Sequence, residues 1–530
     1  MVSMKNNSLI KKGLSLSVLT LFSRILGLVR EMTKAKFLGT TAYSDAFNVA
    51  FMIPNLFRRL FAENAISVAF IPTFKGYIED SDTPEKKQDA QNFVNATFTL
   101  ISFMTTLFVT IGIIFTPLIL KIFFDTEKIN ALDEGIILTR IMFPYLIVIS
   151  IAALFQGILN SLKIFSPSGF TPILFNGIVI GFTYIFKDRM ANPARAMATG
   201  VICGGLVQAF FQLPFVLKND WKITFTSLKN AFTNPGTKKV MLLVAPTIIG
   251  MAGYQLNDVV STALATHSGE GVASSLQYSL RLQELILGIC AVTIGTVILP
   301  DLAGFSKNNE WGKFNELLSQ SIKIMIFISI PITFYSLSMN ENIITLVFAS
   351  GKFNTDSISM TKEVFKFHIA GLCFIALNRI IAPSFYAQQN TKSPTIAGLV
   401  NFAANMILAS ILVRKFGGNG IALALTLASA VNTIMLFIFL GKSKNIQLAP
   451  LIKNTLLYTI KMCLFSAIAA VPVYLLRGKI ISLLAGHDKI ISQGIPVGTT
   501  ALLFGAIGIG LMIVTKDPLI KSVLNKIKSR

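Results

Sequence analysis

Residues Thr99–Leu120 read TLISFMTTLFVTIGIIFTPLIL, an uninterrupted apolar stretch that contains no ionisable side chain. A helix crosses the hydrocarbon core of a bilayer with about 20 mainly apolar residues, so this stretch is long enough to span a membrane. It lies in a predicted span near residues 90–124, and similar apolar windows recur along the whole chain. They predict about fourteen transmembrane helices, near residues 13–38, 42–74, 90–124, 134–162, 168–186, 194–217, 238–266, 271–304, 316–339, 362–388, 393–413, 418–440, 452–476 and 492–515.

The composition agrees with a membrane protein. Of the 530 residues, 53% are hydrophobic and only 14% are charged, whereas a soluble domain carries about a quarter charged residues. The mean hydropathy is +0.66. We therefore predict an all-α polytopic membrane protein, which excludes a typical soluble enzyme. The cysteines and histidines are scattered, so neither a disulfide framework nor a zinc site is indicated.

The net charge of +22, from 47 Lys and Arg against 25 Asp and Glu, is a feature of nucleic-acid-binding proteins when the chain is soluble. Here the basic residues do not form one aromatic-interleaved patch, as a nucleic-acid surface would need. Most of them occupy short connections between apolar segments, and Lys and Arg are enriched in cytoplasmic loops. We therefore expect no nucleic-acid partner, and the distribution of basic residues predicts that both termini are cytoplasmic.

The second and eighth predicted spans end alike. AISVAFIPTF at residues 65–74 and AVTIGTVILPDL at residues 291–302 each place a proline at the end of a similar apolar run. Transporters often duplicate a half and bind substrate between the halves. We therefore predict two six-helix lobes around a central cavity, residues 1–218 and 219–445, followed by two added helices and a cytoplasmic tail in residues 446–530. Chance similarity of two short tails is the alternative.

Ionisable residues inside the first two spans are candidates for function. Such a residue costs several kcal/mol in the bilayer unless it faces a cavity or a partner. The first span contains LFSRILGLVRE, with Ser23, Arg24 and Arg30. The second contains SDAFNVAFMIPNLFRRLFAEN, whose ionisable residues are Asp45, Arg58, Arg59 and Glu63.

The eighth span adds Arg281 and Glu284, which lie on neighbouring positions of one helix face. They could form a pair that only fixes packing, or Arg281 could converge with the arginines of the other half on a central cavity. Guanidinium groups stay charged and bind phosphate bidentately, so several of them in a low-dielectric cavity predict recognition of a diphosphate. Arg59, next to Arg58, points elsewhere and could instead reach lipid phosphates.

A second polar group lies in the C-terminal half. Its members are Asp258 in the seventh span, Asn401 and Asn405 in the eleventh, and Thr426 in the twelfth. Their oxygens are the ligands that a hard cation such as Na⁺ accepts, so a site for a coupling cation, Na⁺ or H⁺, is one interpretation. Interhelical hydrogen bonding explains the asparagines equally well.

Enzyme motifs do not stand out. The sequence GKS at residues 441–443 lacks the upstream glycine of a phosphate-binding loop and follows a membrane span rather than a strand. We therefore expect a transporter rather than an enzyme, with no cofactor other than the coupling cation.

Several segments together resemble the MurJ (MviN) family of lipid II flippases, and the similarity covers nearly the whole chain. They are FSRILGLVRE at residues 22–31, SDAFNVAFMIPNLFRRLFAENAISVAFIPTF at 44–74, FPYLIVISIAALFQGILNSLKIFSPSGFTPILFN at 143–176, GTVILPDL at 295–302, GKF at 351–353 and APSFYAQQNTKSP at 382–394.

This resemblance implies the fold of the multidrug/oligosaccharidyl-lipid/polysaccharide exporter superfamily and an alternating-access transporter of the bacterial inner membrane. The implied substrate is lipid II, undecaprenyl-diphosphate-linked disaccharide-pentapeptide, which moves to the outer leaflet during peptidoglycan synthesis. Membrane lipids and the cell-wall synthesis machinery are the other implied partners. The residues that match the family's cavity and motif positions are Ser23, Arg24, Arg30, Asp45, Arg58, Glu63 and Arg281. The last two helices would form a groove for the lipid tail.

The chain departs from the family pattern at Asn64, where the motif reads FAEGA, and at Asn405, where some members have an aspartate. The second departure leaves the coupling ion open. Rival functions are a flippase for another polyprenyl-linked glycan, a drug exporter of the same superfamily, a membrane glycosyltransferase and a scaffold for cell-wall synthesis. Scarce carboxylates argue against the glycosyltransferase, and the cost of buried arginines argues against a scaffold.

Overall fold

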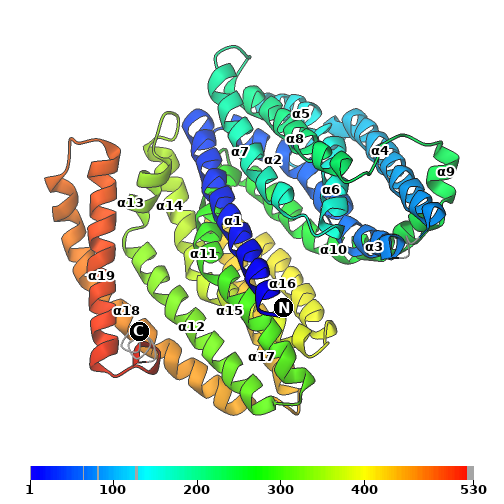
Figure 1. The fold of residues 1–530 in the computed structure, drawn as a ribbon. Coiled ribbons are helices and arrows are strands. Elements are labelled where there is room, and N and C mark those ends of the chain that lie inside the picture. Colours follow the sequence, from blue (N-terminus) through cyan, green and yellow to red (C-terminus); the bar gives the residue numbers. More distant parts are fainter. Residues whose placement is uncertain (1, 64, 80–82, 126–128, 522–530) are drawn as a thin grey trace. The chain divides into compact units, whose positions relative to one another are not determined.

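The computed structural model describes residues 2–63, 65–79, 83–125 and 129–521, with the backbone alone at 2–18, 61–63, 65, 67, 129–130, 245–247, 249–254 and 289–297. In this part of the chain the regular elements are helices (Figure 1), and one isolated bridge joins Ser350 to Phe353. The predicted all-α fold class is confirmed.

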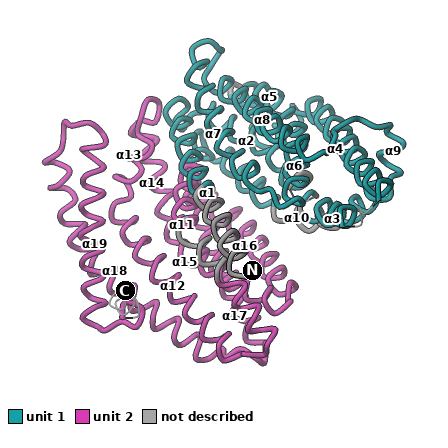
Figure 2. Tube along the Cα trace, in the orientation of Figure 1, with its two compact units in different colours: residues 1–274 teal, residues 275–530 magenta. Residues whose placement is uncertain are grey.

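The chain divides into two compact units, residues 1–274 and 275–530 (Figure 2). The first contains α1 (Val2–Leu38), α2 (Ala42–Phe57), the π-helical turns η1 (Arg58–Glu63) and η2 (Ala65–Phe70), α3 (Ile71–Glu79), α4 (Pro84–Leu120), α5 (Ile129–Met142), α6 (Tyr145–Ser161), α7 (Ser166–Phe186), α8 (Pro193–Lys218), α9 (Leu228–Thr233), α10 (Pro235–Ser268) and the first turn of α11 (Val272–Lys307).

The second unit contains the rest of α11, α12 (Trp311–Ser338), α13 (Asn340–Phe348), α14 (Thr355–Ala370), α15 (Leu372–Ala387), α16 (Lys392–Phe416), α17 (Gly418–Gly441), α18 (Leu448–Leu483), the π-helical turn η3 (Ile490–Gly494) and α19 (Ile495–Val514). The division into lobes at residues 218 and 445 rests on the internal repeat and stays a prediction.

Each predicted span coincides with a helix or with consecutive helices. Within the described residues, nine helices are long and apolar enough to cross a membrane, or ten if α14 and α15 form one bent span. The count of fourteen therefore stays a prediction. The other four predicted spans, 13–38, 42–74, 238–266 and 271–304, are helical as well. The side chains of several residues in these four spans lie outside the described part.

Two of the helix breaks have local causes. α14 and α15 are bent by 41° at Gly371. A side chain at Gly371 would place its Cβ atom 2.4 Å from the Thr426 hydroxyl oxygen, so the glycine permits close packing of α17. In the second span, α2 gives way to η1 four residues after Pro54, which cannot donate a backbone hydrogen bond.

The core of the first unit includes a stack of phenylalanines. Phe70 lies 5.2 Å from Phe74 and 5.4 Å from Phe93 between ring centroids, and Trp221 meets Phe74 edge-on at 4.8 Å. These rings join η2, α3 and α4 to the connection that follows α8.

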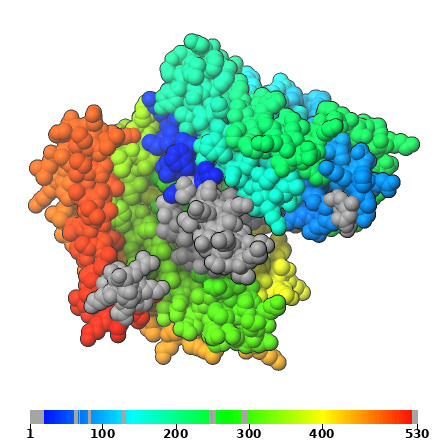
Figure 3. All heavy atoms as spheres, viewed as in Figure 1, coloured from blue at the N-terminus to red at the C-terminus, as the bar shows by residue number. Residues whose placement is uncertain are grey.

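In the second unit, α18 and α19 pack against each other and α18 packs against α12. Tyr335 of α12 donates its hydroxyl hydrogen to the Val497 carbonyl oxygen at 2.5 Å, and its ring meets Phe504 of α19. Lys461 of α18 contacts the fully buried Asp517 carboxylate at 2.6 Å. These contacts attach the two helices that the sequence sets apart from the repeat, drawn in orange and red in Figure 3.

Candidate functional site

Arg30 lies on α1 in a largely buried position, with 13% of its side chain exposed. Its Nη2 atom is 2.9 Å from Glu31 Oε1. The guanidinium carbon is 5.8 Å from the ring centroids of both Phe51 on α2 and Phe175 on α7. Rings at this distance attract a cation through their quadrupoles. The two rings and the carboxylate together fix the guanidinium in place.

Glu31 also contacts a second cation. Lys34, one helical turn further along α1, places Nζ 2.6 Å from Glu31 Oε2 and 2.8 Å from Asn48 Oδ1. The Glu31 and Lys34 side chains are only 7% and 4% exposed. The cluster of Arg30, Glu31 and Lys34 therefore has two cations for one carboxylate. Guanidinium and ammonium donors in a dry site favour an anionic ligand.

The hydrogen bonds continue from this cluster to the beginning of α11. Asn48 donates from Nδ2 to Ser274 Oγ at 3.0 Å, and Ser274 Oγ donates to Asp45 Oδ1 at 2.6 Å. The predicted site residues Arg30 and Asp45 are thus joined through Glu31, Lys34, Asn48 and Ser274. All six residues belong to the first unit.

Asp45 caps α11 from another helix. Its side chain is 3% exposed, and it accepts the backbone N–H of Gly271 at 2.7 Å and that of Ser274 at 2.8 Å. Glu270 does the converse, because its Oε1 accepts the N–H of Ala42 at the start of α2, at 2.9 Å. The positive N-terminal ends of α2 and α11 meet here. The Asp45 carboxylate compensates the end of α11, and the Glu270 carboxylate compensates the end of α2.

Gly271 makes the close approach at this junction possible. Its φ angle is +79°, in the left-handed region, and a Cβ atom would lie 2.3 Å from the Thr40 carbonyl oxygen. Glycine alone meets both demands without strain. We call the contacts of Asp45, Glu270, Gly271 and Ser274 with the start of α2 the α2–α11 junction.

Other predicted residues of the first unit lie on α1 and at the end of α2. Ser23 accepts, through its carbonyl oxygen, a hydrogen bond of 3.4 Å from Asn176 Nδ2 of α7, and the neighbouring Arg24 is half-buried. Arg58 donates from Nε to Asn55 Oδ1 at 2.9 Å. The side chain of Glu63 and the residue Asn64 lie outside the described part.

Arg281 belongs to the second unit. Its Nη1 atom is 2.8 Å from Glu284 Oε2, and the two side chains are 39% and 55% exposed. The contact that the three-residue spacing indicated therefore exists. A pair this open leaves the guanidinium accessible to a ligand, and its role in a cavity stays a prediction.

Asp258 contacts Arg59, which the sequence had directed towards lipid phosphates. Arg59 Nη1 lies 3.4 Å from both Gln255 Oε1 and Asp258 Oδ2. This ion pair joins η1 to α10 within the first unit. In the structure the Asp258 carboxylate is thus paired with an arginine, and its service as a cation ligand stays a prediction.

The remaining candidates for a cation site lie on two packed helices of the second unit, α16 and α17. Asn405 is buried, and Asn401 has a buried Oδ1 atom that accepts no hydrogen bond within the described residues. Thr426 donates its hydroxyl hydrogen to the Phe367 carbonyl oxygen at 2.6 Å, which leaves lone pairs on its oxygen. An oxygen such as Asn401 Oδ1 fits a hard cation.

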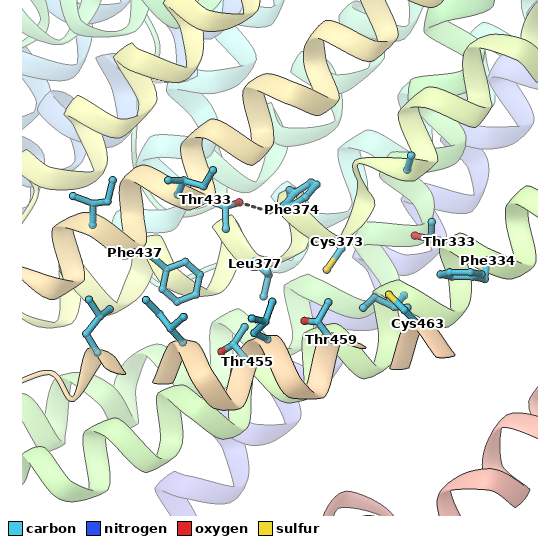
Figure 4. Close-up of a pocket in the computed structure, with 17 residues that line it drawn as sticks. Thr333, Phe334, Cys373, Phe374, Leu377, Thr433, Phe437, Thr455, Thr459 and Cys463 are labelled. Atoms are coloured by element: carbon cyan, nitrogen blue, oxygen red, sulfur yellow. Dashed lines mark hydrogen bonds between the residues drawn. The ribbon is translucent and has the colours of Figure 1, made fainter. Parts of the chain in front are cut away.

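An apolar cavity of about 580 Å³ lies within the second unit. Its walls come from α12, α14, α15, α17 and α18, and Figure 4 shows Phe374, Phe437 and Leu377 along it. Thr455, Thr459 and Cys463 reach it from α18. Of the last two helices, α18 contributes to the described lining of this cavity and α19 does not, and the groove for the lipid tail stays a prediction.

Sequence reasoning passed over Glu31 and Lys34. Both fall inside the first predicted span, and their opposite charges at three-residue spacing are the signal that singled out Arg281 and Glu284 in the eighth span. Asn48, Ser274 and Glu270 gave no such signal, because their importance comes from the meeting of α2 with α11. That meeting is a tertiary contact between residues far apart in the sequence.

The family model and the sequence relatives that match this chain are described as lipid II flippase MurJ or probable lipid II flippase MurJ. A family model described as lipid II flippase MurJ matches residues 34–484. The probable lipid II flippase MurJ of Treponema pallidum (strain Nichols) is 45% identical over 524 residues, which cover 98% of this chain and 99% of that protein. The lipid II flippase MurJ of Burkholderia cenocepacia is 30% identical over 449 residues, which cover 84% and 86%.

Solved structures agree with the sequence relatives. A lipid II flippase MurJ in an inward closed conformation superposes with a TM-score of 0.77 and 26% identity, covering 95% of this chain and 99% of that one. An inward-facing multidrug resistance MATE family transporter of the MOP superfamily superposes with a TM-score of 0.66. At 15% identity over 81% of this chain and 96% of that one, it shares the fold alone.

Proposed function

The chain belongs to the MurJ family of lipid II flippases, and we propose that it carries lipid II from the cytoplasmic to the outer leaflet of the bacterial inner membrane by alternating access. The substrate follows from the family. The observation that supports an anion-binding route is the buried cluster of two cations and one carboxylate at Arg30, Glu31 and Lys34.

In this mechanism Arg30 binds the diphosphate. Its guanidinium is oriented by Glu31 and by two aromatic rings, and it has N–H donors beyond the one that Glu31 accepts. A diphosphate can bridge several guanidinium groups, so Arg24, Arg58 and Arg281 share its charge when the lobes enclose it. Because the arginines are fixed before the ligand arrives, little conformational freedom is lost on binding.

The α2–α11 junction closes the outer side in this mechanism. With cytoplasmic termini, the connection between α1 and α2 and the connection between α10 and α11 both face outward. α11 begins in the first unit at this junction and continues into the second. In this proposal, arrival of the diphosphate at Arg30 perturbs the hydrogen bonds that lead through Asn48 and Ser274 to Asp45. Release of the Asp45 and Glu270 contacts then frees the start of α11 and opens the outer side.

The prenyl tail stays outside the polar cavity and uses the apolar cavity beside α18. A cavity of about 580 Å³ is the size that encloses a drug-sized ligand, so it takes a part of the long tail rather than the whole. The head group then crosses in water while the tail remains in an apolar environment. This division removes the cost of moving sugars and charges through hydrocarbon.

Two sources of energy fit the residues. The membrane potential contributes about 2.3 kcal/mol per charge per 100 mV to outward movement of an anionic head group. A cation held by Asn401, Asn405 and Thr426 would supply a second gradient and reset the inward state. Asn401 Oδ1, a buried oxygen without a hydrogen bond in the described part, supports this assignment.

Complementation tests the function. We expect this chain to restore growth, and lipid II in the outer leaflet, to a strain depleted of its own lipid II flippase. Arg30→Ala should fail, while Arg189→Ala, a change in the exposed connection between α7 and α8, should complement. Failure of the unaltered chain, when it is inserted and stable in the membrane, would contradict lipid II flipping. A strain that lacks a flippase for another polyprenyl-linked glycan provides the comparison.

A further inference from the structure

The connection between α8 and α9 runs in an extended form along α4. Gln91, Asn95 and Thr99 lie four residues apart on one face of α4. Each accepts one hydrogen bond from the connection, and the three donors are alternate backbone N–H groups. Four residues of a helix rise about 6 Å, which nearly equals two residues of an extended chain. The three bonds are Lys222 N–H to Gln91 Oε1 at 3.1 Å, Thr224 N–H to Asn95 Oδ1 at 3.2 Å, and Thr226 N–H to Thr99 Oγ1 at 2.9 Å.

Buried anchors at both ends complete this attachment. Trp221 is 7% exposed, and Ala231 and Thr237 are fully buried. Thr237 donates its hydroxyl hydrogen to the Ala231 carbonyl oxygen at 2.6 Å. Residues 218–239, which we call the interfacial segment, are thus held on α4 with a defined face turned outward. Figure 1 shows α9, the helix within this segment, beside α4.

The surface of α4 locates the membrane boundary. Its first turns expose Glu85, Lys86 and Lys87, and exposed large apolar side chains begin at Phe103. From there a stripe with helical spacing continues through Met104, Leu107, Ile111, Ile114, Phe115 and Leu118. A stripe of this kind faces lipid. The hydrocarbon region therefore begins near Phe103 on the side of the chain that is predicted to be cytoplasmic.

The interfacial segment lies at this boundary. Phe225 packs against Phe98 with 4.8 Å between ring centroids, and Phe232 meets Phe103 edge-on at 6.1 Å. Phe225 is nevertheless 71% exposed and Leu228 44% exposed, so both present apolar surface outward. The segment carries five exposed lysines, Lys218, Lys222, Lys229, Lys238 and Lys239, against one acid, Asp220.

We propose that the interfacial segment binds anionic phospholipid head groups of the cytoplasmic leaflet. Exposed aromatic and aliphatic side chains at the hydrocarbon edge, flanked by lysines, are the composition that inserts into an interface and attracts anionic lipids. The attachment to α4 holds the lysines at head-group height before lipid arrives. The occupant is a bilayer phospholipid, because the apolar side chains need acyl chains beside the charges.

The experiment uses the full chain in nanodiscs and reads lipid binding, so its outcome does not depend on transport. Phe225→Trp, with Trp221→Phe and Trp311→Phe, gives a single tryptophan in the segment, since the chain has two natural tryptophans. Energy transfer from this tryptophan to dansyl-phosphatidylglycerol should exceed transfer to dansyl-phosphatidylcholine at equal lipid content. Replacing phosphatidylcholine by an excess of unlabelled phosphatidylglycerol should displace the label.

Lys229→Gln, Lys238→Gln and Lys239→Gln together should remove most of this preference, about fivefold for each lysine. The matched control is Lys352→Gln, Lys415→Gln and Lys479→Gln, three exposed lysines in connections predicted to face outward. The control should keep the preference. Equal transfer to the two labels, or an unchanged preference in the first triple variant, would overturn the proposal. So would displacement by undecaprenyl diphosphate but not by phosphatidylglycerol. An unchanged thermal unfolding midpoint shows that a lost preference does not come from misfolding.

Discussion

Ser274 and Asp45 are joined twice: the Asp45 Oδ1 atom accepts the Ser274 backbone N–H at 2.8 Å and the Ser274 hydroxyl hydrogen at 2.6 Å. A side chain from α2 therefore supplies the cap that Gly271, at the start of α11, cannot supply itself. At the other end of this chain of contacts lies Arg30, so the junction is connected with the arginine that we propose binds the diphosphate.

Asp45→Asn tests the junction. Asparagine retains one acceptor oxygen but loses the negative charge that compensates the N-terminus of α11. We expect a loss of roughly 1–3 kcal/mol, the cost of a disturbed buried hydrogen-bonding group. Thermal unfolding in detergent measures the loss, and labelling of Ser274→Cys should become faster. Asp188→Asn, at an exposed carboxylate beside Lys187, is the control and should leave both readouts unchanged.

Gly271→Ala tests the close approach. The φ angle of +79° and the Thr40 carbonyl oxygen both oppose a Cβ atom, so we expect destabilisation of about 1–3 kcal/mol. The control is Gly304→Ala in α11, where no atom lies within 4 Å of the new Cβ. That change should be neutral or stabilise the helix by up to about 1 kcal/mol. Equal unfolding midpoints for the two variants would show that the junction does not need glycine.

Lys34→Met tests the buried charges. The change removes the Lys34 contacts with Glu31 and Asn48, and within the cluster it leaves Arg30 as the cationic partner of Glu31. Because breaking a buried ion pair costs about 3–5 kcal/mol, we expect a loss of stability of this order. In the Glu31→Gln background the same change should cost much less, because Lys34 has there already lost its carboxylate partner. Unfolding of the four proteins in a double-mutant cycle measures the coupling. Additive effects would argue against the ion pair.

Glu31→Gln by itself tests how Arg30 is held. Without Glu31 the guanidinium of Arg30 loses its orienting carboxylate, so we expect weak complementation by this variant even at a normal protein level. Full complementation would mean that Arg30 does not require Glu31.

Thr459→Trp tests the apolar cavity. The indole fills space beside α18 that the prenyl tail would occupy, and loss of contact with about two methylene groups, at about 0.8 kcal/mol each, weakens binding roughly tenfold. Binding of an analogue with a short prenyl chain should be unaffected. Thr499→Trp, at an exposed position on α19, is the control. Equal affinities of the Thr459→Trp variant and the unaltered chain for lipid II would place the tail elsewhere.

Much of the architecture could be predicted from hydropathy, because a bilayer imposes length and composition on each span. The helices match the predicted spans, and ionisable residues in apolar segments led to Arg30 and Asp45. Their partners could not be found in that way. Asn48, Glu270 and Ser274 are ordinary polar residues until folding brings the starts of α2 and α11 together. The bend at Gly371 was also missed, because it depends on packing against Thr426, which is a tertiary contact.

The central claim is that arginines of the predicted membrane spans carry the head group of lipid II across the membrane. Leaflet accessibility of lipid II tests it most directly, in cells that depend on this chain and carry Arg24→Ala, Arg30→Ala or Arg281→Ala. The account predicts that lipid II stays in the cytoplasmic leaflet in each variant, while Arg189→Ala behaves as the unaltered chain. Normal outward movement of lipid II in Arg24→Ala, Arg30→Ala and Arg281→Ala, at normal protein levels, would contradict it.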